Sequence, residues 1–394
     1  MNFVVEYKDC CGCGACHEVC PKNAISMKTD ECGYIFAEID NNLCIDCQKC
    51  RSVCPSIKNN YDSDFTKKAY AGTSLDPSTK KSASGGIFAL FAKKVLSEGG
   101  VVFGTEMNEE FDVQVIGISS EDDLYKLQGS KYVQSNMLPA FNQIKEVLKT
   151  KKVLFCGTPC QVSALKNYIG KNDNLLLVDL VCHGVPNNKM FKDEIATLQK
   201  KYKNNLTAYV FRDKDYGHNC IGNLQFKNKN KKALYSYFSP YYTIFLKNDV
   251  LRESCYSCKY SSIDRPGDIT ICDYWGVQNE EGEFFKDCND KGFVGISGII
   301  TNTEKGQSFF EENKDMLFYK ESTVEKIQNG NANLVHPSIK GKNRDTVLAI
   351  YKENGWDGVK KFCKKKYKTK ILVRKIYNIC PKFVKKLARR VLGK

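Results

Sequence analysis

One pattern of cysteines occurs twice near the start of this sequence, and it constrains the fold more than any other feature. The pattern is C-x2-C-x2-C-x3-C-P, and all five positions recur at a single offset of 34 residues, which marks an internal repeat. The first run consists of Cys10, Cys13, Cys16, Cys20 and Pro21, and the second of Cys44, Cys47, Cys50, Cys54 and Pro55.

The spacing distinguishes between three uses of clustered thiols. Cysteines this close along the chain are poorly placed to form disulfides with one another. Zinc usually takes pairs of C-x-x-C separated by a spacer, not three thiolates within seven residues. A cubane [4Fe–4S] cluster fits the spacing, because one tight loop can supply three of its thiolates.

In two-cluster ferredoxins the fourth thiolate of each run binds the other cluster. On this pattern one cluster is expected on Cys10, Cys13, Cys16 and Cys54, and the other on Cys44, Cys47, Cys50 and Cys20. Gly12 and Gly14 let the backbone wrap closely around the sulfurs. Cys11 is out of step with the run, and we expect a spare side chain that faces away from the cluster.

Composition indicates where such a chain works. The 394 residues suffice for two or three domains, and 20 cysteines without a recognisable signal peptide favour a reducing compartment and metal binding. No apolar run approaches the roughly 18 residues of a membrane helix. We therefore expect a cytoplasmic protein.

The net charge of +15 is concentrated at one end of the chain. Residues 361–394 contain 14 Lys or Arg and no Asp or Glu, which leaves +1 for the first 360 residues. A nucleic-acid enzyme would carry its basic footprint on the folded domain, so no nucleic-acid partner is expected.

Residue patterns divide the chain into three parts. We expect a ferredoxin-like domain over 1–58, a larger mixed α/β or α+β domain over 67–345, and a basic helical tail over 346–394. In the central part, "VLFC" predicts a strand, "GTP" a turn and Cys160 onward a helix, and "NLLLVDLV" predicts the next strand of a βαβ unit.

The stretch "SASGG" has two interpretations. Ser82 and Ser84 can cap a helix running from about Gly85 to Ser97. Alternatively, Ser82, Ser84, Gly85 and Gly86 form a seat for a phosphate group, because small residues expose N–H groups at the positive end of a helix dipole.

Four further cysteines stand where α/β folds build sites. Cys160 lies at a strand-to-helix turn, Cys182 ends the next strand, and Cys255 and Cys258 form a C-x-x-C. These four could hold a third [4Fe–4S] cluster, or they could be buried structural thiols.

Several stretches together resemble the beta subunits of coenzyme F420 hydrogenases and dehydrogenases and their bacterial relatives. They include "SASGGIFAL", "LQGSKYVQS", "VLFCGTPCQVSALK", "LVCHGVP", "FRDKDYGH", "CYSCKY" and "RPGDITICDYWG", in the family's order. The resemblance implies an FAD-bearing oxidoreductase domain with its own [4Fe–4S] cluster, which the ferredoxin clusters supply with electrons.

The resemblance also implies roles for individual residues. The "SASGG" turn and the "GTPCQ" turn, with Gly157, Thr158 and Gln161, would border the flavin. Lys131 is a candidate cation near flavin or substrate, or a solvated surface lysine. His183 is a candidate hydrogen-bond donor or acid, or a structural histidine. Arg212 and Lys214 could hold an acidic substrate or pair with Asp213 and Asp215, and Asp273 and Trp275 could flank the C-x-x-C cluster or simply pack.

Two functions follow from the resemblance. In the first, the chain is an enzyme that passes electrons between its clusters and FAD, and reduces or oxidises a small organic acceptor or coenzyme F420. Some relatives of the family resemble proteins linked to surface-polysaccharide synthesis, so the acceptor could be a small molecule used in that synthesis. In the second, the chain is an electron-transfer component that works with ferredoxin or with a larger hydrogenase or dehydrogenase complex. A zinc-stabilised interaction protein is a third, weaker alternative.

The tail predicts a basic amphipathic helix. Its apolar positions recur every three or four residues, with Pro381 between them, at Leu372, Ile376, Ile379, Phe383, Leu387 and Val391. The apolar face could pack on the protein itself, or it could lie on an anionic membrane surface as a peripheral contact.

Overall fold

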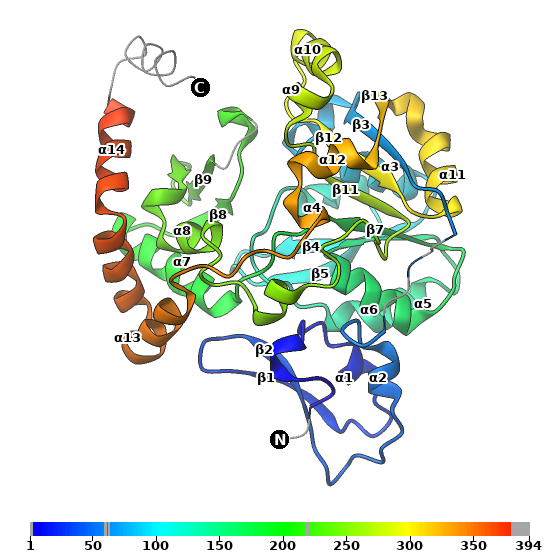
Figure 1. The fold of residues 1–394 in the computed structure, drawn as a ribbon, viewed down its shortest axis with the longest axis horizontal. Helices are drawn as coiled ribbons and strands as arrows, with labels where there is room; N and C mark the ends of the chain where they lie inside the picture. Colours follow the sequence, from blue (N-terminus) through cyan, green and yellow to red (C-terminus); the bar gives the residue numbers. More distant parts are fainter. Residues whose placement is uncertain (1–2, 59–60, 62–63, 218–220, 380–394) are drawn as a thin grey trace.

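The computed structural model describes residues 3–58, 61, 64–217 and 221–379. An N-terminal ferredoxin-type unit lies at one end of the molecule, against helices α5 and α6 of a larger α/β body (Figure 1). The elements of this unit are α1 (Ala15–Glu18), β1 (Ile25–Thr29), β2 (Ile35–Ile39) and α2 (Lys49–Val53).

The cysteine repeat is also visible in the backbone of this unit. Each run of cysteines leads into a short helix, and the residue before that helix is left-handed in both cases: Gly14 has φ 86° and Gln48 has φ 58°. Strands β1 and β2 pair antiparallel between the two runs. The two halves therefore fold as one turn-and-helix unit used twice.

An eight-stranded sheet forms the centre of the large body, in the order β13-β3-β12-β11-β7-β6-β4-β5. Strands β4, β6, β7 and β11 are parallel, and the strands outside them pair antiparallel. The bounds are β3 (Lys68–Ser74), β4 (Val101–Met107), β5 (Val113–Ile118), β6 (Val153–Gly157), β7 (Leu175–Leu180), β11 (Ile269–Asp273), β12 (Ser297–Thr301) and β13 (Leu317–Ser322).

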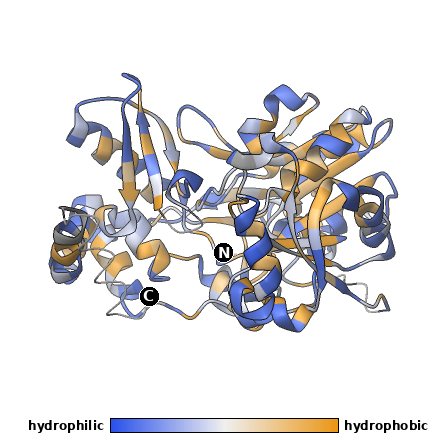
Figure 2. Ribbon diagram, turned by 90° about the horizontal axis from the view of Figure 1, so that it is seen from above, coloured by the Kyte–Doolittle hydropathy of each residue, from blue (hydrophilic) through white to orange (hydrophobic). Residues whose placement is uncertain are grey.

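Successive side chains of these strands point to opposite faces of the sheet, so a hydrophobic core forms on each face. Leu154 packs with helices α3 (Ile87–Ser97) and α11 (Glu304–Asn313) on one face. Its neighbours Val153 and Phe155 pack with α5 (Leu138–Val147) and α6 (Pro159–Ile169) on the other. Figure 2 shows hydrophobic residues along the strands of this sheet and hydrophilic residues along much of the surrounding helices. Both faces are covered, as is usual for parallel strands.

The expected βαβ unit is present, because β6, α6 and β7 follow one another and the two strands pair in parallel. The remaining helices of the large body are short connections or lie at its edges. They are α4 (Leu124–Leu127), α9 (Val277–Glu280), α10 (Gly282–Asp290) and α12 (Val324–Gly330).

A second lobe packs beside the large sheet (Figure 1). It combines a three-stranded antiparallel sheet with helices, and its core is rich in Phe and Tyr. Its elements are α7 (Asn188–Tyr202), β8 (Leu206–Val210), β9 (Ile221–Phe226), β10 (Lys231–Tyr235), α8 (Pro240–Leu246) and α13 (Arg344–Lys366).

One expected helix start is wrong. Helix α3 begins at Ile87 instead of Gly85, and its N-cap is Gly86, with φ 80° and no side-chain cap. The two serines are engaged elsewhere: Ser84 Oγ donates to the Ile296 carbonyl (2.9 Å), and Ser82 Oγ accepts from Gln128 Nε2 (2.9 Å). Tertiary hydrogen bonds therefore take the place of the local cap.

The tail begins as a packed element. Helix α13 buries Val359 and Cys363 in the core of the second lobe, and Tyr367 follows them there. Helix α14 (Lys368–Ile379) continues the chain, and Leu372 is more than half exposed. Residues 380–394, with Pro381, Phe383, Leu387 and Val391, lie outside the described residues.

In the part of the chain that the structure describes, no helix combines the length and the apolar character that crossing a bilayer requires.

Candidate redox centre

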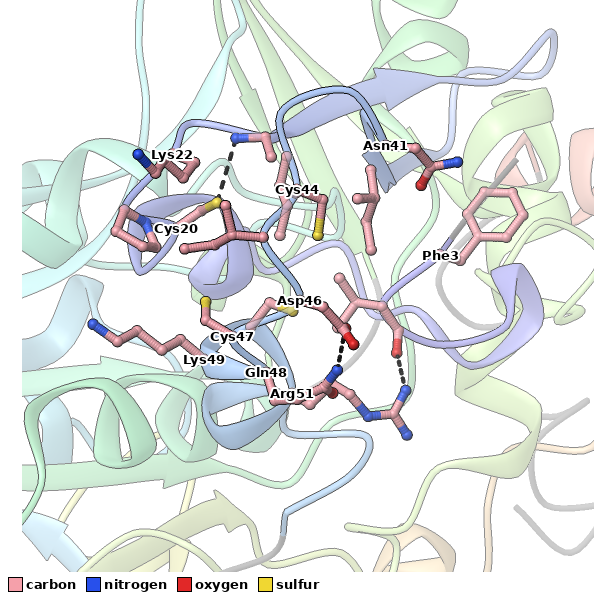
Figure 3. Close-up of a pocket in the computed structure, with 17 residues that line it drawn as sticks. Phe3, Cys20, Lys22, Asn41, Cys44, Asp46, Cys47, Gln48, Lys49 and Arg51 are labelled. Atoms are coloured by element: carbon pink, nitrogen blue, oxygen red, sulfur yellow. Dashed lines mark hydrogen bonds between the residues drawn. The ribbon is translucent and has the colours of Figure 1, made fainter.

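Three cysteines of the second run meet one cysteine of the first run in a surface cavity of about 210 Å³ (Figure 3). We call these four residues, Cys20, Cys44, Cys47 and Cys50, the outer thiol group. Cys44 and Cys47 are exposed, and Cys20 Sγ accepts a hydrogen bond from the Ala24 N–H (3.3 Å). The group therefore opens directly to the surface of the N-terminal unit.

The other four cysteines of the repeat line a second, smaller cavity of about 20 Å³. We call Cys10, Cys13, Cys16 and Cys54 the middle thiol group. Burial raises the pKa of the Cys16 thiol to about 12, and backbone N–H groups of Ala15 and His17 point at Cys13 and Cys16. The structure thus brings together the two sets of four that the sequence pattern pairs, each with its fourth cysteine from the other run.

The four central cysteines also converge, from three separate segments. Cys160 is in the first turn of α6, Cys182 lies two residues beyond β7, and Cys255 and Cys258 belong to the short 3-10 helix Glu253–Ser257 and the residue after it. Cys182, Cys255 and Cys258 each lie close enough to Cys160 for its charge to raise their pKa. We call this set the inner thiol group.

Backbone N–H groups surround the inner thiols. Gly184 N–H donates to Cys182 Sγ (3.3 Å), and N–H groups of Gln161, Val185 and Tyr260 point at Cys160, Cys255 and Cys258. Such donors stabilise thiolate sulfurs and help to set the reduction potential of an iron–sulfur cluster. The donor set therefore fits a [4Fe–4S] group.

Among the described residues, no three His, Cys, Asp or Glu side chains are arranged around a single metal ion. A cubane separates its ligands more widely than one ion does, because each thiolate binds a different iron.

Cys11 does not face away, contrary to the sequence-based expectation. Its thiol lies within hydrogen-bonding reach of the thiols of both Cys13 and Cys160. Cys11 therefore stands between the middle and inner thiol groups. Sequence analysis missed this position, because the contact joins segments about 150 residues apart.

A cavity of about 520 Å³ adjoins the inner thiol group. It lies where the parallel strands β4, β6, β7 and β11 end, the usual place for ligands in α/β sheets. Its volume is within the range of small-molecule and cofactor sites. The predicted residues that line it are Ser82, Ser84, Lys131, Gly157, Thr158, Cys160, Gln161, Cys182, His183, Arg212, Asp273 and Trp275.

Gly85 and Gly86 do not line this cavity. Gly85 N–H donates to Ser297 Oγ (2.9 Å), and a side chain at Gly85 would approach the Gly72 carbonyl to 2.4 Å. A side chain at Gly86 would approach Thr79 Oγ1 to 2.8 Å, and Gly86 N–H donates to the Ala83 carbonyl (3.1 Å). Both glycines therefore serve close packing, and their N–H groups have partners within the fold instead of facing the cavity as a phosphate seat requires.

The turn between β6 and α6 is held rigidly. Thr158 and Gln161 form a capping box, and Gln161 Nε2 donates to Ser135 Oγ (2.9 Å). Thr158 Oγ1 also lies 3.3 Å from Cys160 Sγ. The turn therefore links one wall of the cavity to the inner thiol group.

Lys131 is half-buried in the wall of this cavity. Its Nζ donates to the carbonyls of Lys126 (3.0 Å) and Gln128 (2.8 Å). Burial lowers the pKa of this ammonium group to about 7. An anion in the cavity would favour the protonated form.

His183 follows directly after Cys182 and packs edge-on against Phe245, with 5.3 Å between the ring centroids. Burial lowers the pKa of His183, and the side chains of Asn248 and Asn333 partly oppose that shift. This shift favours the neutral form of the imidazole. Asn333, like His183, lies at the cavity wall.

Arg212, Asp273 and Trp275 come together at the cavity wall. The Arg212 guanidinium forms an ion pair with Asp273 and lies 5.3 Å from the centre of the Trp275 ring. Arg212 thus pairs with a distant carboxylate, in place of the neighbouring Asp213 or Asp215. Burial lowers the pKa of the adjacent Lys214 to about 8.

Two family models match the chain, one at each part of this centre. The model for the 4Fe-4S dicluster domain matches residues 9–57, and the model for the C terminus of the coenzyme F420 hydrogenase/dehydrogenase beta subunit matches residues 150–327. Residues 150–327 therefore carry the C-terminal domain of the coenzyme F420 hydrogenase/dehydrogenase beta-subunit family. Residues 9–57 carry a 4Fe-4S dicluster domain.

Relatives of this chain include one of the subunits of the F(420)H(2) dehydrogenase of Methanosarcina mazei, 25% identical over 198 residues, which cover 45% of this chain and 54% of that protein. Coenzyme F420-dependent sulfite reductase of Methanocaldococcus jannaschii is 29% identical over 171 residues, 42% of this chain and 26% of that enzyme. The chain thus spans about half the length of the first and about a quarter of the second.

The N-terminal unit has separate relatives. A ferredoxin-like protein in the nif region of Rhizobium leguminosarum is 39% identical over 61 residues, which cover 14% of this chain and 88% of that protein. The N-terminal unit is therefore similar to a ferredoxin-like protein over most of that protein's length. Lys131 and the "SASGG" turn lie outside the matched residues 150–327.

Proposed function

We propose that this relative of the beta subunits is a flavin-dependent iron–sulfur oxidoreductase with three [4Fe–4S] sites, at the outer, middle and inner thiol groups. The observation that carries this proposal is that two members of the inner thiol group, Cys160 and Cys182, also line the 520 Å³ cavity. Bound there, FAD would exchange single electrons with the clusters and electron pairs with an organic acceptor.

The residues of the cavity have distinct parts in this proposal. The backbone and side chains of the 157–161 turn, with Ser82 and Ser84, border the flavin. Lys131 carries a proton when an anionic group of the flavin or substrate enters, because the anion raises its pKa. His183 supplies a neutral hydrogen-bond donor beside Cys182, with its ring held by Phe245.

Exposure of the outer thiol group favours this group as the point of entry for electrons. Cys44 and Cys47 are exposed, whereas Cys16 and Cys54 of the middle group are buried. A one-electron carrier such as ferredoxin could approach the outer group directly. The acceptor remains coenzyme F420 or another small organic molecule, including one used in surface-polysaccharide synthesis.

Anaerobic reconstitution tests the proposal. Three cubanes require about 12 irons per chain, and the protein should also retain one flavin. Replacing Cys255 and Cys258 together by Ser should remove about four irons and leave the signals of the N-terminal clusters intact. The matched control replaces Cys288, which is buried in a core that contains no cysteine of the three thiol groups. Full iron in the double variant, or no flavin in the native protein, would count against the proposal.

The second candidate is an electron-transfer component of a larger complex. The name of the Methanosarcina mazei relative, which is one part of a dehydrogenase, favours it. The discriminating measurement is turnover by the purified full chain with a reduced ferredoxin and F420 or an artificial hydride acceptor. Reduction of the clusters without turnover would favour the relay function.

A further inference from the structure

The backbone of residues 10–12 runs between two of the thiol groups. Cys11, Gly12 and Cys13 line both the small cavity of the middle thiol group and the large cavity beside the inner thiol group. The Cys11 thiol lies within reach of Cys13 in the first and of Cys160 in the second. Cys11 is thus in contact with both groups, although neither cysteine run includes it.

Arg252 fastens this segment to the large domain. Its side chain is almost fully buried, its Nε donates to the Cys10 carbonyl (2.7 Å), and another guanidinium nitrogen donates to the Ile35 carbonyl. Its own N–H donates to the Val185 carbonyl (2.9 Å), three residues after Cys182. One arginine therefore ties the N-terminal unit to the segment that carries the inner group.

Gln134 completes the attachment. Its side-chain oxygen accepts from Arg252 Nη1 (3.0 Å), and its Nε2 donates to the Cys11 carbonyl (3.2 Å). Gly12 makes this approach feasible, because its φ is +67° and a side chain there would lie 2.7 Å from Gln134 Nε2 and 3.0 Å from Arg252 Cζ. The contact is built from both domains and leaves no room for a side chain at position 12.

We infer that residues 10–12, fixed by Arg252 and Gln134, form a junction that holds the middle thiol group against the inner thiol group for direct electron exchange. Cys11 is the side chain in the gap, and Arg252 is a positioning residue. The exchange moves one electron, so that one bound group is oxidised, the other is reduced, and no bond of the chain forms or breaks. A one-electron reductant such as dithionite or reduced ferredoxin supplies the electron.

The inference rests on the proposed cluster at the inner thiol group, and its test does not require flavin or turnover. The reconstituted full chain is reduced with dithionite, and electron paramagnetic resonance records the magnetic interaction between neighbouring reduced clusters. The variants are Cys11→Ala, Arg252→Gln and Arg252→Lys. The controls are Cys32→Ala, a buried cysteine of the same unit, and Arg344→Gln, a buried arginine that donates to the Leu251 carbonyl (3.2 Å).

We expect the native protein and both controls to show the interaction, and Cys11→Ala and Arg252→Gln to lose or weaken it with iron content unchanged. Arg252→Lys keeps the charge and loses the forked hydrogen bonds, so it should also weaken the interaction. Absence of the interaction in the native protein, or its full retention in Cys11→Ala and both Arg252 variants, overturns the junction. Loss of about four irons in Cys11→Ala would make Cys11 a ligand and would also overturn it. A coupled protein without flavin would refute the proposed function and leave the junction standing.

Discussion

Lys131 titrates near neutrality, because burial lowers its pKa to about 7. The group is protonated below that pH and neutral above it. We therefore expect an anionic ligand of the cavity to bind more tightly below pH 7, with affinity falling by up to about tenfold per pH unit above it. The measurement is the dissociation constant of FAD from the reconstituted protein on either side of neutrality.

Lys131→Gln should bind FAD more weakly at low pH and lose most of this pH dependence. Lys145→Gln, which changes an exposed lysine, is the control and should behave as the native protein does. An unchanged pH profile in Lys131→Gln would show that another group carries the dependence.

Asp179 and Arg265 form a buried ion pair at the end of β7. Arg265 Nη2 donates to Asp179 Oδ1 (2.6 Å) and Nε to the same oxygen (2.9 Å), while Gly267 N–H and Thr270 Oγ1 also donate to this carboxylate. Asp179→Ala leaves the guanidinium buried without its partner, which typically costs about 3–5 kcal/mol. The check is urea unfolding of the iron-loaded protein.

The exposed pair Lys149–Glu146 is the control for this prediction, with 2.6 Å between its charged atoms. Glu146→Gln should change stability far less, because exposed ion pairs contribute little. Equal effects of the two substitutions would mean that burial does not set the strength of the Asp179–Arg265 pair.

At the scale of single elements, the first part of the tail packs on the second lobe. Cys363 and Tyr367 are buried in the second lobe, and Ile371 packs against the same core. A chain that ends after Ile371 should therefore keep its fold, whereas one that ends at Lys360 loses buried contacts. This boundary comes from the structure, because the basic composition is continuous across it.

Residues 372–394 contain eight Lys or Arg and no acidic residue. If they lie on an anionic surface, each nearby positive charge contributes about 1 kcal/mol of attraction. We expect the full chain to sediment with anionic vesicles and the chain ending after Ile371 to remain in solution. Neutral vesicles are the control. Equal binding of both chains, or of neither, would remove the membrane function of the tail.

Across the whole molecule, the sequence predicted features that depend on local spacing. The doubled cysteine run and the strand–helix–strand unit around Cys160 are of this kind, because their ligand spacing and hydrophobic period lie within short windows. The predicted serine cap of α3 was wrong, because Ser84 and Ser82 form hydrogen bonds with Ile296 and Gln128, which are distant in the sequence. No local pattern in the sequence indicated the contacts of Cys11 and Arg252, because these contacts join positions as much as some 240 residues apart.

The exchange of fourth cysteines between the two runs has a consequence for synthesis. The middle group joins Cys54 to residues 10–16, and the outer group joins Cys20 to residues 44–50. The small core of the unit consists of Val4, Ile25 and Ala37 together with Cys16 and Cys54. Such a core is too small to hold a fold alone without a metal or another staple.

A nascent chain therefore cannot complete either group until the second run has left the ribosome. The first three thiols must wait, reduced and open to oxidants, for Cys54, which is made 38 residues after Cys16. Iron insertion and folding of the unit then occur together, as metal binding and folding do in other small domains that lack a preformed site. The timing of cluster delivery, more than the stability of the finished protein, would decide how much of the chain matures.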